Sequence, residues 1–251
     1  MKTVRAGILM AIILSLCAGT AFAIPSLQLN IGGGFYVGGT DETIYSSSKT
    51  FDLYAYLIPT TNGSPNLLTD TYYVSAALVP QTVEPGGSYG SFTFAGSSVN
   101  VTGGMVYGTP PLETLATQLG DPGDLAPHGI FETYFQQFDF TFGEDQVTPF
   151  NTQDQPGFLG DAGTGMYYKK FAVNVNGLDP GYSIHFDLYN SKILEAARNP
   201  NVILGDVDVN NFAPFSHDAQ SDGRVPEAGA LLLFGTGLIG LVGYRRVRRM
   251  Q

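Results

Sequence analysis

The chain has 251 residues, a net charge of −10 at neutral pH, 43% hydrophobic residues and only 14% charged residues. Its 32 Gly and 15 Pro stay below the share of about 25–30% that marks low-complexity disorder, so the chain is expected to fold. Few charges combined with 12% aromatic residues exclude a coiled coil, a helical repeat and a disordered tail.

The first 23 residues have the pattern of a secretory signal peptide. Lys2 and Arg5 precede an apolar run over residues 8–16, and Ala21-Phe22-Ala23 is the small-x-small motif that signal peptidase accepts. A retained membrane helix is the alternative, but the apolar run is well short of the about 20 residues that cross a bilayer. We therefore predict a signal peptide over residues 1–23, with cleavage after Ala23.

This cleavage removes Cys17, the only cysteine of the chain. Lipidation of Cys17 is a minor alternative, because Leu16 precedes it where a lipid anchor needs a small residue. The mature chain is thus expected to have no disulfide, no catalytic thiol and no cysteine-ligated metal.

Residues 24–224 form the predicted exported domain, and they carry 21 of the 22 acids but only 6 of the 12 basic residues, a net charge of −15. Such a surface repels nucleic acid and anionic lipid, so neither is expected as a partner. The excess charge is typical of a soluble exported domain.

Alternating apolar and polar residues predict strands throughout this domain. The alternation is clearest in three segments, and in each of them three apolar residues share one face of the strand. These residues are Phe138, Phe140 and Phe142 in the first segment, Phe171, Val173 and Val175 in the second, and Ile184, Phe186 and Leu188 in the third. Further strands are expected at residues 27–31, 51–57, 72–79, 91–94, 99–101 and 202–209, and helical turns at residues 112–119 and 193–198. Many short strands without long helices indicate an all-β fold, namely an antiparallel β-sandwich or jelly roll.

His185 and Asp187 are one candidate site, because residues two apart on a strand share a face and could supply half of a metal site. With no further ligand spacing visible, we expect a solvent-exposed or hydrogen-bonded pair instead. Ser216-His217-Asp218 contains the residue types of a hydrolase triad, but neighbours on an extended chain point to opposite faces. We predict a polar loop there and no catalytic residues.

Asp206, Asp208 and Asn210 have the spacing that opens a calcium loop. The continuation is poor, because Asn211 stands where the loop needs Gly and His217 where it needs a bidentate Glu. We expect an ordinary acidic strand, and so predict no bound metal.

The C-terminal segment, residues 225–251, reads as a membrane anchor. Pro226 and Glu227 precede an uncharged stretch over residues 228–244, and a basic tail over residues 245–251 contains Arg245, Arg246, Arg248 and Arg249. A buried core helix or strand is the alternative, but four arginines in five residues are typical of a stop-transfer signal. We predict a transmembrane helix at about residues 228–244, with the exported domain outside the cytoplasm.

Gly235-Thr236-Gly237-Leu238-Ile239-Gly240 matches the dinucleotide fingerprint within this stretch. Only 241–251 remain after it, so the required strand and acidic residue have no room. No cofactor is therefore expected.

Together, Pro226, Glu227, the apolar helix rich in Leu and Gly and the arginine cluster resemble the PEP-CTERM sorting signal. Ala228 departs from the usual second proline of that signature. The resemblance implies recognition by an exosortase of a Gram-negative bacterium, a transient stay in the inner membrane, and delivery to the cell surface or the exopolysaccharide matrix.

The exported domain itself is similar to the choice-of-anchor N family, whose members end in such anchors. The motifs that carry this resemblance are Leu27-Gln28-Leu29, Gly108-Thr109-Pro110-Pro111-Leu112, Pro127-His128-Gly129-Ile130-Phe131, His185-Phe186-Asp187-Leu188 and Phe212-Ala213-Pro214-Phe215-Ser216-His217-Asp218-Ala219. We expect a structural or interaction protein of the cell envelope, not an enzyme. A carbohydrate-binding module of an exopolysaccharide matrix is the alternative, and a secreted hydrolase is a third, less favoured class.

Overall fold

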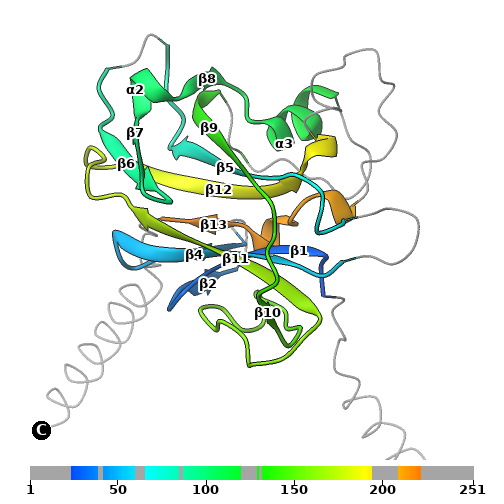
Figure 1. The fold of residues 1–251 in the computed structure, drawn as a ribbon. Helices are drawn as coiled ribbons and strands as arrows, with labels where there is room; N and C mark the ends of the chain where they lie inside the picture. The colour runs from blue at the N-terminus through cyan, green and yellow to red at the C-terminus, as the bar shows by residue number, and fades with distance from the viewer. Residues whose placement is uncertain are drawn as a thin grey trace, which may run out of the picture.

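The computed structural model describes residues 24–38, 42–59, 66–84, 87–119, 129, 132–193 and 209–221. These residues form two β-sheets packed face to face, with β12, β5 and β9 in one layer and β4, β11 and β1 in the other (Figure 1). The expected all-β sandwich is confirmed. The predicted signal peptide and C-terminal segment lie outside the described residues.

Sheet A has six strands in the order β1-β4-β11-β6-β7, and β10 pairs with β11 beside this path. Its strands are β1 (Leu27–Ile31), β4 (Thr50–Leu57), β6 (Ser91–Phe94), β7 (Ser97–Asn100), β10 (Gln146–Val147) and β11 (Met166–Asn174). All pairs in sheet A are antiparallel.

Sheet B has seven strands in the order β2-β3-β13-β12-β5-β9-β8. They are β2 (Phe35–Val37), β3 (Thr43–Tyr45), β5 (Tyr72–Val79), β8 (Val106–Gly108), β9 (Thr133–Phe140), β12 (Ser183–Asn190) and β13 (Ala219–Gln220). The pair β13 and β3 is parallel, so the prediction of a purely antiparallel sandwich is wrong at this one junction. Parallel strands need a long connection between them, and β3 and β13 are far apart in the sequence.

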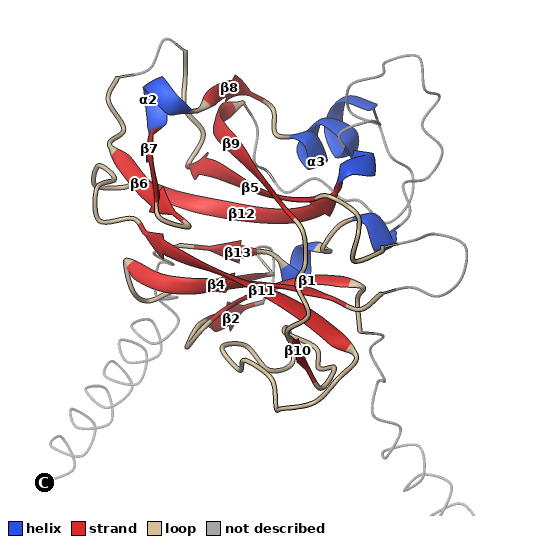
Figure 2. Ribbon diagram, viewed as in Figure 1, coloured by secondary structure: helices blue, strands red, loops and turns tan. Residues whose placement is uncertain are grey.

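The helical elements are short and sit at the ends of strands, as Figure 2 shows for α2 and α3. They are α2 (Val101–Gly104), α3 (Pro111–Glu113), the π-helix η1 (Thr114–Leu119), and the 3-10 helices η2 (Val209–Asn211) and η3 (Phe215–His217). The helical turn expected at residues 112–119 is confirmed, with Pro111 in its first turn. Residues 191–193 are also helical, so the turn expected at residues 193–198 is described only at its first residue, and the rest of it lies outside the described residues.

Two strand ends differ from the prediction. Val101 begins α2 instead of ending a strand, because the Asn100 side chain accepts a 2.8 Å hydrogen bond from the Gly103 amide and caps that helix. Val209 belongs to the 3-10 helix η2 and not to a strand. The rest of the strand expected at residues 202–209 lies outside the described residues.

The main core lies between the sheets and is built from the alternating apolar residues. Phe94 of sheet A stacks on Phe171 of the same sheet at 5.0 Å between ring centroids and on Phe138 of sheet B at 4.2 Å. Phe186 from β12 is fully buried in the same cluster. This aromatic packing joins the two sheets at their centre.

A second, smaller core of Tyr56, Val147, Phe150 and Met166 lies on the other face of sheet A. The segment after β10 covers this face, and buried polar residues of β1 bind it. The Gln28 side chain donates to the Phe150 carbonyl at 3.2 Å, and the Asn30 side chain donates to the Phe158 carbonyl at 2.6 Å. Part of sheet A is therefore covered on both faces.

Candidate functional site

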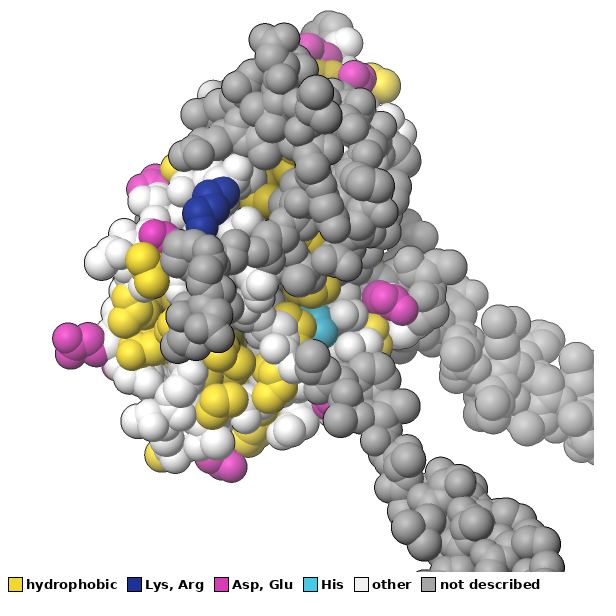
Figure 3. Space-filling view, turned by 90° about the vertical axis from the view of Figure 1, so that its right-hand side faces the viewer, with side chains coloured by type: hydrophobic (Ala, Val, Ile, Leu, Met, Phe, Trp, Pro, Cys, Tyr) yellow, Lys and Arg dark blue, Asp and Glu magenta, His cyan; other side chains and the backbone are white. Residues whose placement is uncertain are grey.

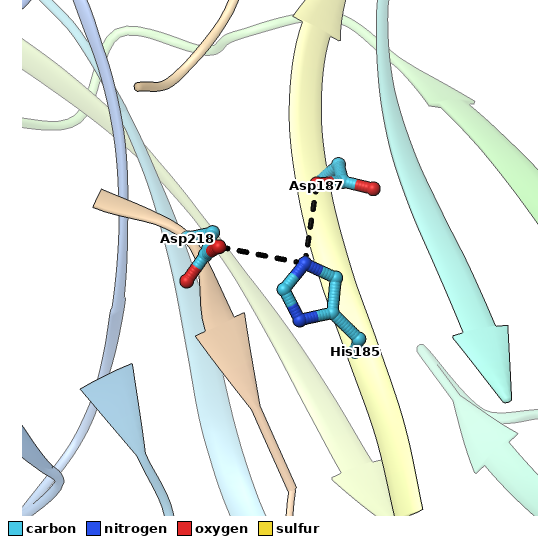
Figure 4. A group of neighbouring side chains, drawn as sticks. All are labelled: His185, Asp187 and Asp218. Atoms are coloured by element: carbon cyan, nitrogen blue, oxygen red, sulfur yellow. Dashed lines mark hydrogen bonds and ion pairs between the residues drawn. The ribbon is translucent and has the colours of Figure 1, made fainter. Parts of the chain in front are cut away.

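A histidine and two aspartates meet on the face of sheet B that points away from the main core. Ile184, Phe186 and Leu188 of β12 point into that core, so His185 and Asp187 point the opposite way. β13 pairs with β12 so that Gln220 lies opposite His185, and Asp218 comes two residues earlier on the same face. The pairing of β12 with β13 thus assembles three residues from two distant parts of the sequence (Figure 4).

The imidazole lies between the two carboxylates. His185 Nε2 is 3.3 Å from Asp187 Oδ1 and 3.5 Å from Asp218 Oδ2. The other ring nitrogen, Nδ1, is 3.4 Å from Gln220 Oε1. The three side chains are only 2–4% exposed, so water does not screen their charges effectively.

These charges control the protonation of the cluster. Burial lowers the pKa of His185, but the neighbouring Asp218 and Asp187 outweigh burial and raise the pKa to about 9. Burial also raises the pKa of Asp218 well above its ordinary value, against the opposing charge of His185. At neutral pH the His185 imidazole therefore holds a proton between the carboxylates, and a divalent cation could take the place of that proton.

We expected His185 and Asp187 to be either solvent-exposed or hydrogen-bonded, and the structure shows a hydrogen-bonded pair. Both side chains are buried. Every residue of β12 after Ser183 is buried, since elements pack on both faces of the strand. Asp218 was missed as their neighbour, because no local spacing connects it to a strand more than 30 residues earlier.

The side chains of His217 and Asp218 lie in two different environments, although Ser216 and His217 belong to the 3-10 helix η3 and not to an extended strand. Asp218 faces His185, whereas His217 Nε2 lies 2.9 Å from Asn151 Oδ1 and Nδ1 lies 2.7 Å from Ser216 Oγ. The expected polar loop is nevertheless wrong, because Ser216 and His217 belong to this helix, and His217 and Asp218 are buried just before β13. Burial lowers the pKa of His217 to about 4, so this imidazole is neutral at neutral pH.

The residues proposed for calcium are only partly described. Asp206 and Asp208 lie outside the described residues, and Asn210 Oδ1 accepts a 2.5 Å hydrogen bond from Ser26 Oγ. The expected absence of calcium at these residues stays a prediction. Within the described ranges, His185, Asp187 and Asp218 are the group whose ligand atoms come together, all within 4.8 Å of one another.

The residues of the two processing signals also lie outside the described ranges. They are Ala21 and Ala23 at the signal peptidase site, and Pro226, Glu227, Arg245, Arg246, Arg248 and Arg249 in the C-terminal segment. Within the ranges that the structure describes, no helix is long and apolar enough to cross a membrane. The helix expected at about residues 228–244 stays a prediction.

Comparison with known protein families identifies one segment of the chain. Residues 224–249 match the PEP-CTERM protein-sorting motif. Comparisons with curated proteins and with solved structures find no significant match. The motif implies a chain that is exported and processed by an exosortase at the membrane, and it begins three residues after Ser221, the buried end of the described domain.

Proposed function

We propose that residues 24–224 form a non-enzymatic structural or interaction domain of the cell envelope, which its C-terminal motif delivers to the cell surface or the extracellular matrix of a Gram-negative bacterium. The observation that carries this proposal is the sorting motif at residues 224–249, directly after a β-sandwich that ends at residue 221. An exosortase and, transiently, the inner membrane are the partners. The likeness of the domain to the choice-of-anchor N family belongs to this proposal and rests on the short motifs quoted above.

The burial of the titratable cluster supports a role without catalysis. A hydrolase needs at least two titratable groups that converge where a substrate can reach them. His185, Asp187 and Asp218 converge, but their side chains are 2–4% exposed. On the face drawn in Figure 3, acidic side chains are scattered over the described surface and do not form one large patch, as expected for charge that keeps a domain soluble.

The test removes the polar signature that the processing enzyme must read. The double change Pro226→Ala and Glu227→Gln should trap the full-length chain in the inner membrane of a host with an exosortase. The control is Asp222→Asn, which removes a neighbouring negative charge just outside the matched residues 224–249. Normal release of the double variant would contradict the proposal, because a simple anchor needs only apolar length and flanking charge.

A second candidate, glycan binding, is favoured by the tyrosines beside the second core. Tyr54 and Tyr168 are half-buried, with ring centroids 6.1 Å apart, and Tyr54 lies across the β-ladder from Lys170. An exposed ion pair joins Lys170 Nζ to Asp52 Oδ2 at 3.4 Å. Aromatic faces beside polar groups suit the apolar and hydroxylated faces of a sugar.

Affinity electrophoresis in polysaccharide gels tests this candidate. Replacing Tyr54 and Tyr168 with Ala should abolish any retardation of the exported chain. Tyr73→Ala is the matched control, since Tyr73 is also half-buried and stacked on another tyrosine, but on sheet B. Equal retardation of all variants would exclude this face as the binding site.

A further inference from the structure

The spacing of the atoms around His185 is unusual for a hydrogen-bonded ion cluster. A charged N–H donor and a carboxylate normally lie about 2.7–2.9 Å apart. Here Nε2 lies 3.3 Å from Asp187 Oδ1 and 3.5 Å from Asp218 Oδ2, and its single hydrogen can point at only one of them. The three groups surround a common point instead of pairing closely (Figure 4).

The same spacing fits ligands around a metal ion. A tetrahedral ion with bonds of about 2.0–2.2 Å to nitrogen and oxygen holds its ligand atoms about 3.3–3.6 Å apart. The distances from Nε2 to the two carboxylate oxygens fall in this range, and all three ligand atoms lie within 4.8 Å of one another. A neutral imidazole and two carboxylates are also a common type of ligand set for a borderline cation such as Zn²⁺.

The surroundings orient these ligands as they do in metal sites. Gln220 Oε1 lies 3.4 Å from His185 Nδ1 and can accept a hydrogen bond from a protonated Nδ1, which leaves the Nε2 lone pair directed toward the carboxylates. Thr43 on β3 also hydrogen-bonds the Asp218 side chain. Gln220 belongs to β13 and Thr43 belongs to its neighbour β3. The fold therefore positions the ligands before any ion binds.

We propose that His185 Nε2, Asp187 and Asp218 bind one Zn²⁺ ion inside the exported domain. The ion joins β12 to β13, a strand of only two residues that is the last described element before the sorting motif. Its role is to fasten the end of the domain where the chain leaves toward the membrane. This inference does not depend on whether the domain binds a glycan or on how the C-terminus is processed.

Metal analysis and thermal unfolding of the full-length chain, purified in detergent and stripped with a chelator, test the proposal. After Zn²⁺ is added and the excess removed, we expect one Zn²⁺ per chain by elemental mass spectrometry. The melting temperature should rise by roughly 8 °C or more when free Zn²⁺ is about 1,000-fold above its dissociation constant. Mn²⁺ should bind more weakly than Zn²⁺.

Two matched variants separate this site from other histidines. His185→Gln should lose the bound Zn²⁺ and the rise in melting temperature, whereas His217→Gln, at another buried histidine, should keep both. Because each rise is measured within one variant, a lower starting stability does not affect the comparison. If His185→Gln does not fold, Asp218→Asn is used in its place, with Co²⁺ as a spectroscopic substitute for Zn²⁺. The visible absorption bands of bound Co²⁺ should then be lost in Asp218→Asn.

Three results would overturn the proposal. They are a chain that retains no Zn²⁺, a rise in melting temperature that is the same in His185→Gln, and an equal rise with Ca²⁺, which would indicate a site made of oxygen ligands alone.

Discussion

At the scale of single residues, the fold buries two histidines and shifts their pKa values in opposite directions. His185 lies between carboxylates, which raise its pKa to about 9, so its charge contributes stability in the metal-free chain. That contribution is present below the unfolded value of about 6.5 and is lost as the pH rises through about 9. His217 lies beside the neutral Asn151 and Ser216, and burial alone lowers its pKa to about 4.

His217 should therefore make the protein sensitive to mild acid. Between pH 6.5 and 4 the unfolded chain binds a proton at this residue and the folded chain does not, so the free energy of unfolding falls as the pH drops. The loss attributable to His217 is about 3 kcal/mol at most by pH 4, and it vanishes above about pH 7. Urea unfolding at a series of pH values measures it.

The difference between the wild type and His217→Gln isolates this one group from all other titrating residues. That difference should favour the wild type at neutral pH and shrink as the pH falls from 6.5 to 4. Parallel pH profiles for the two proteins would show that His217 is accessible to protons in the folded state.

At the scale of elements, the longer strands were predictable and the shortest were not. Strands β1, β5 and β6 have the predicted bounds, because their residues alternate over enough positions to fix a face. β2, β3, β8, β10 and β13 have two or three residues each, too few for a period to appear. These short strands form because their backbone groups pair with the edge of a neighbouring strand, which is a tertiary effect.

The candidate site follows the same division. Strand periodicity predicted that His185 and Asp187 share a face, and they do. Asp218 joins them only through β13, which sits in sheet B between β12 and β3. The burial of β12 on both faces was also unpredictable, since its sequence alternates as a half-exposed strand would.

Two glycines on either side of β6 test how tightly the backbone packs there. Gly90 forms a bridge to Leu178 with a φ of +84°, and a Cβ there would lie 2.1 Å from the Gly177 carbonyl oxygen. Gly96, in the turn between β6 and β7, has the same φ of +84° but open space around a Cβ. The two glycines thus differ in crowding and not in backbone conformation.

We expect Gly96→Ala to lower the free energy of unfolding by about 1–2 kcal/mol, the cost of alanine in a left-handed conformation. Gly90→Ala should cost roughly 1–3 kcal/mol more, because the backbone around Gly177 must move. Urea denaturation of both variants measures the difference. Equal losses would mean that the bridge between Gly90 and Leu178 is loose.

At the scale of the whole molecule, an acidic β-sandwich precedes a C-terminal sorting motif in the same chain. Residues 24–224 carry a net charge of −15, which is typical of a soluble exported domain. The sorting motif at residues 224–249 begins three residues after Ser221, the buried last residue of the described domain, so cleavage within the motif would leave the described sandwich intact. Release and folding would then be independent steps.

The central claim is that the chain is exported and cut at both ends, and the mass of the mature protein tests it most directly. Intact mass spectrometry of protein collected from the surface of a host with an exosortase should show an N-terminus at Ile24 and a C-terminus that lacks Arg245 to Arg249. Ala228 in place of proline leads us to expect a residual uncut fraction in the inner membrane. A surface-released protein that still ends at Gln251 would contradict the account.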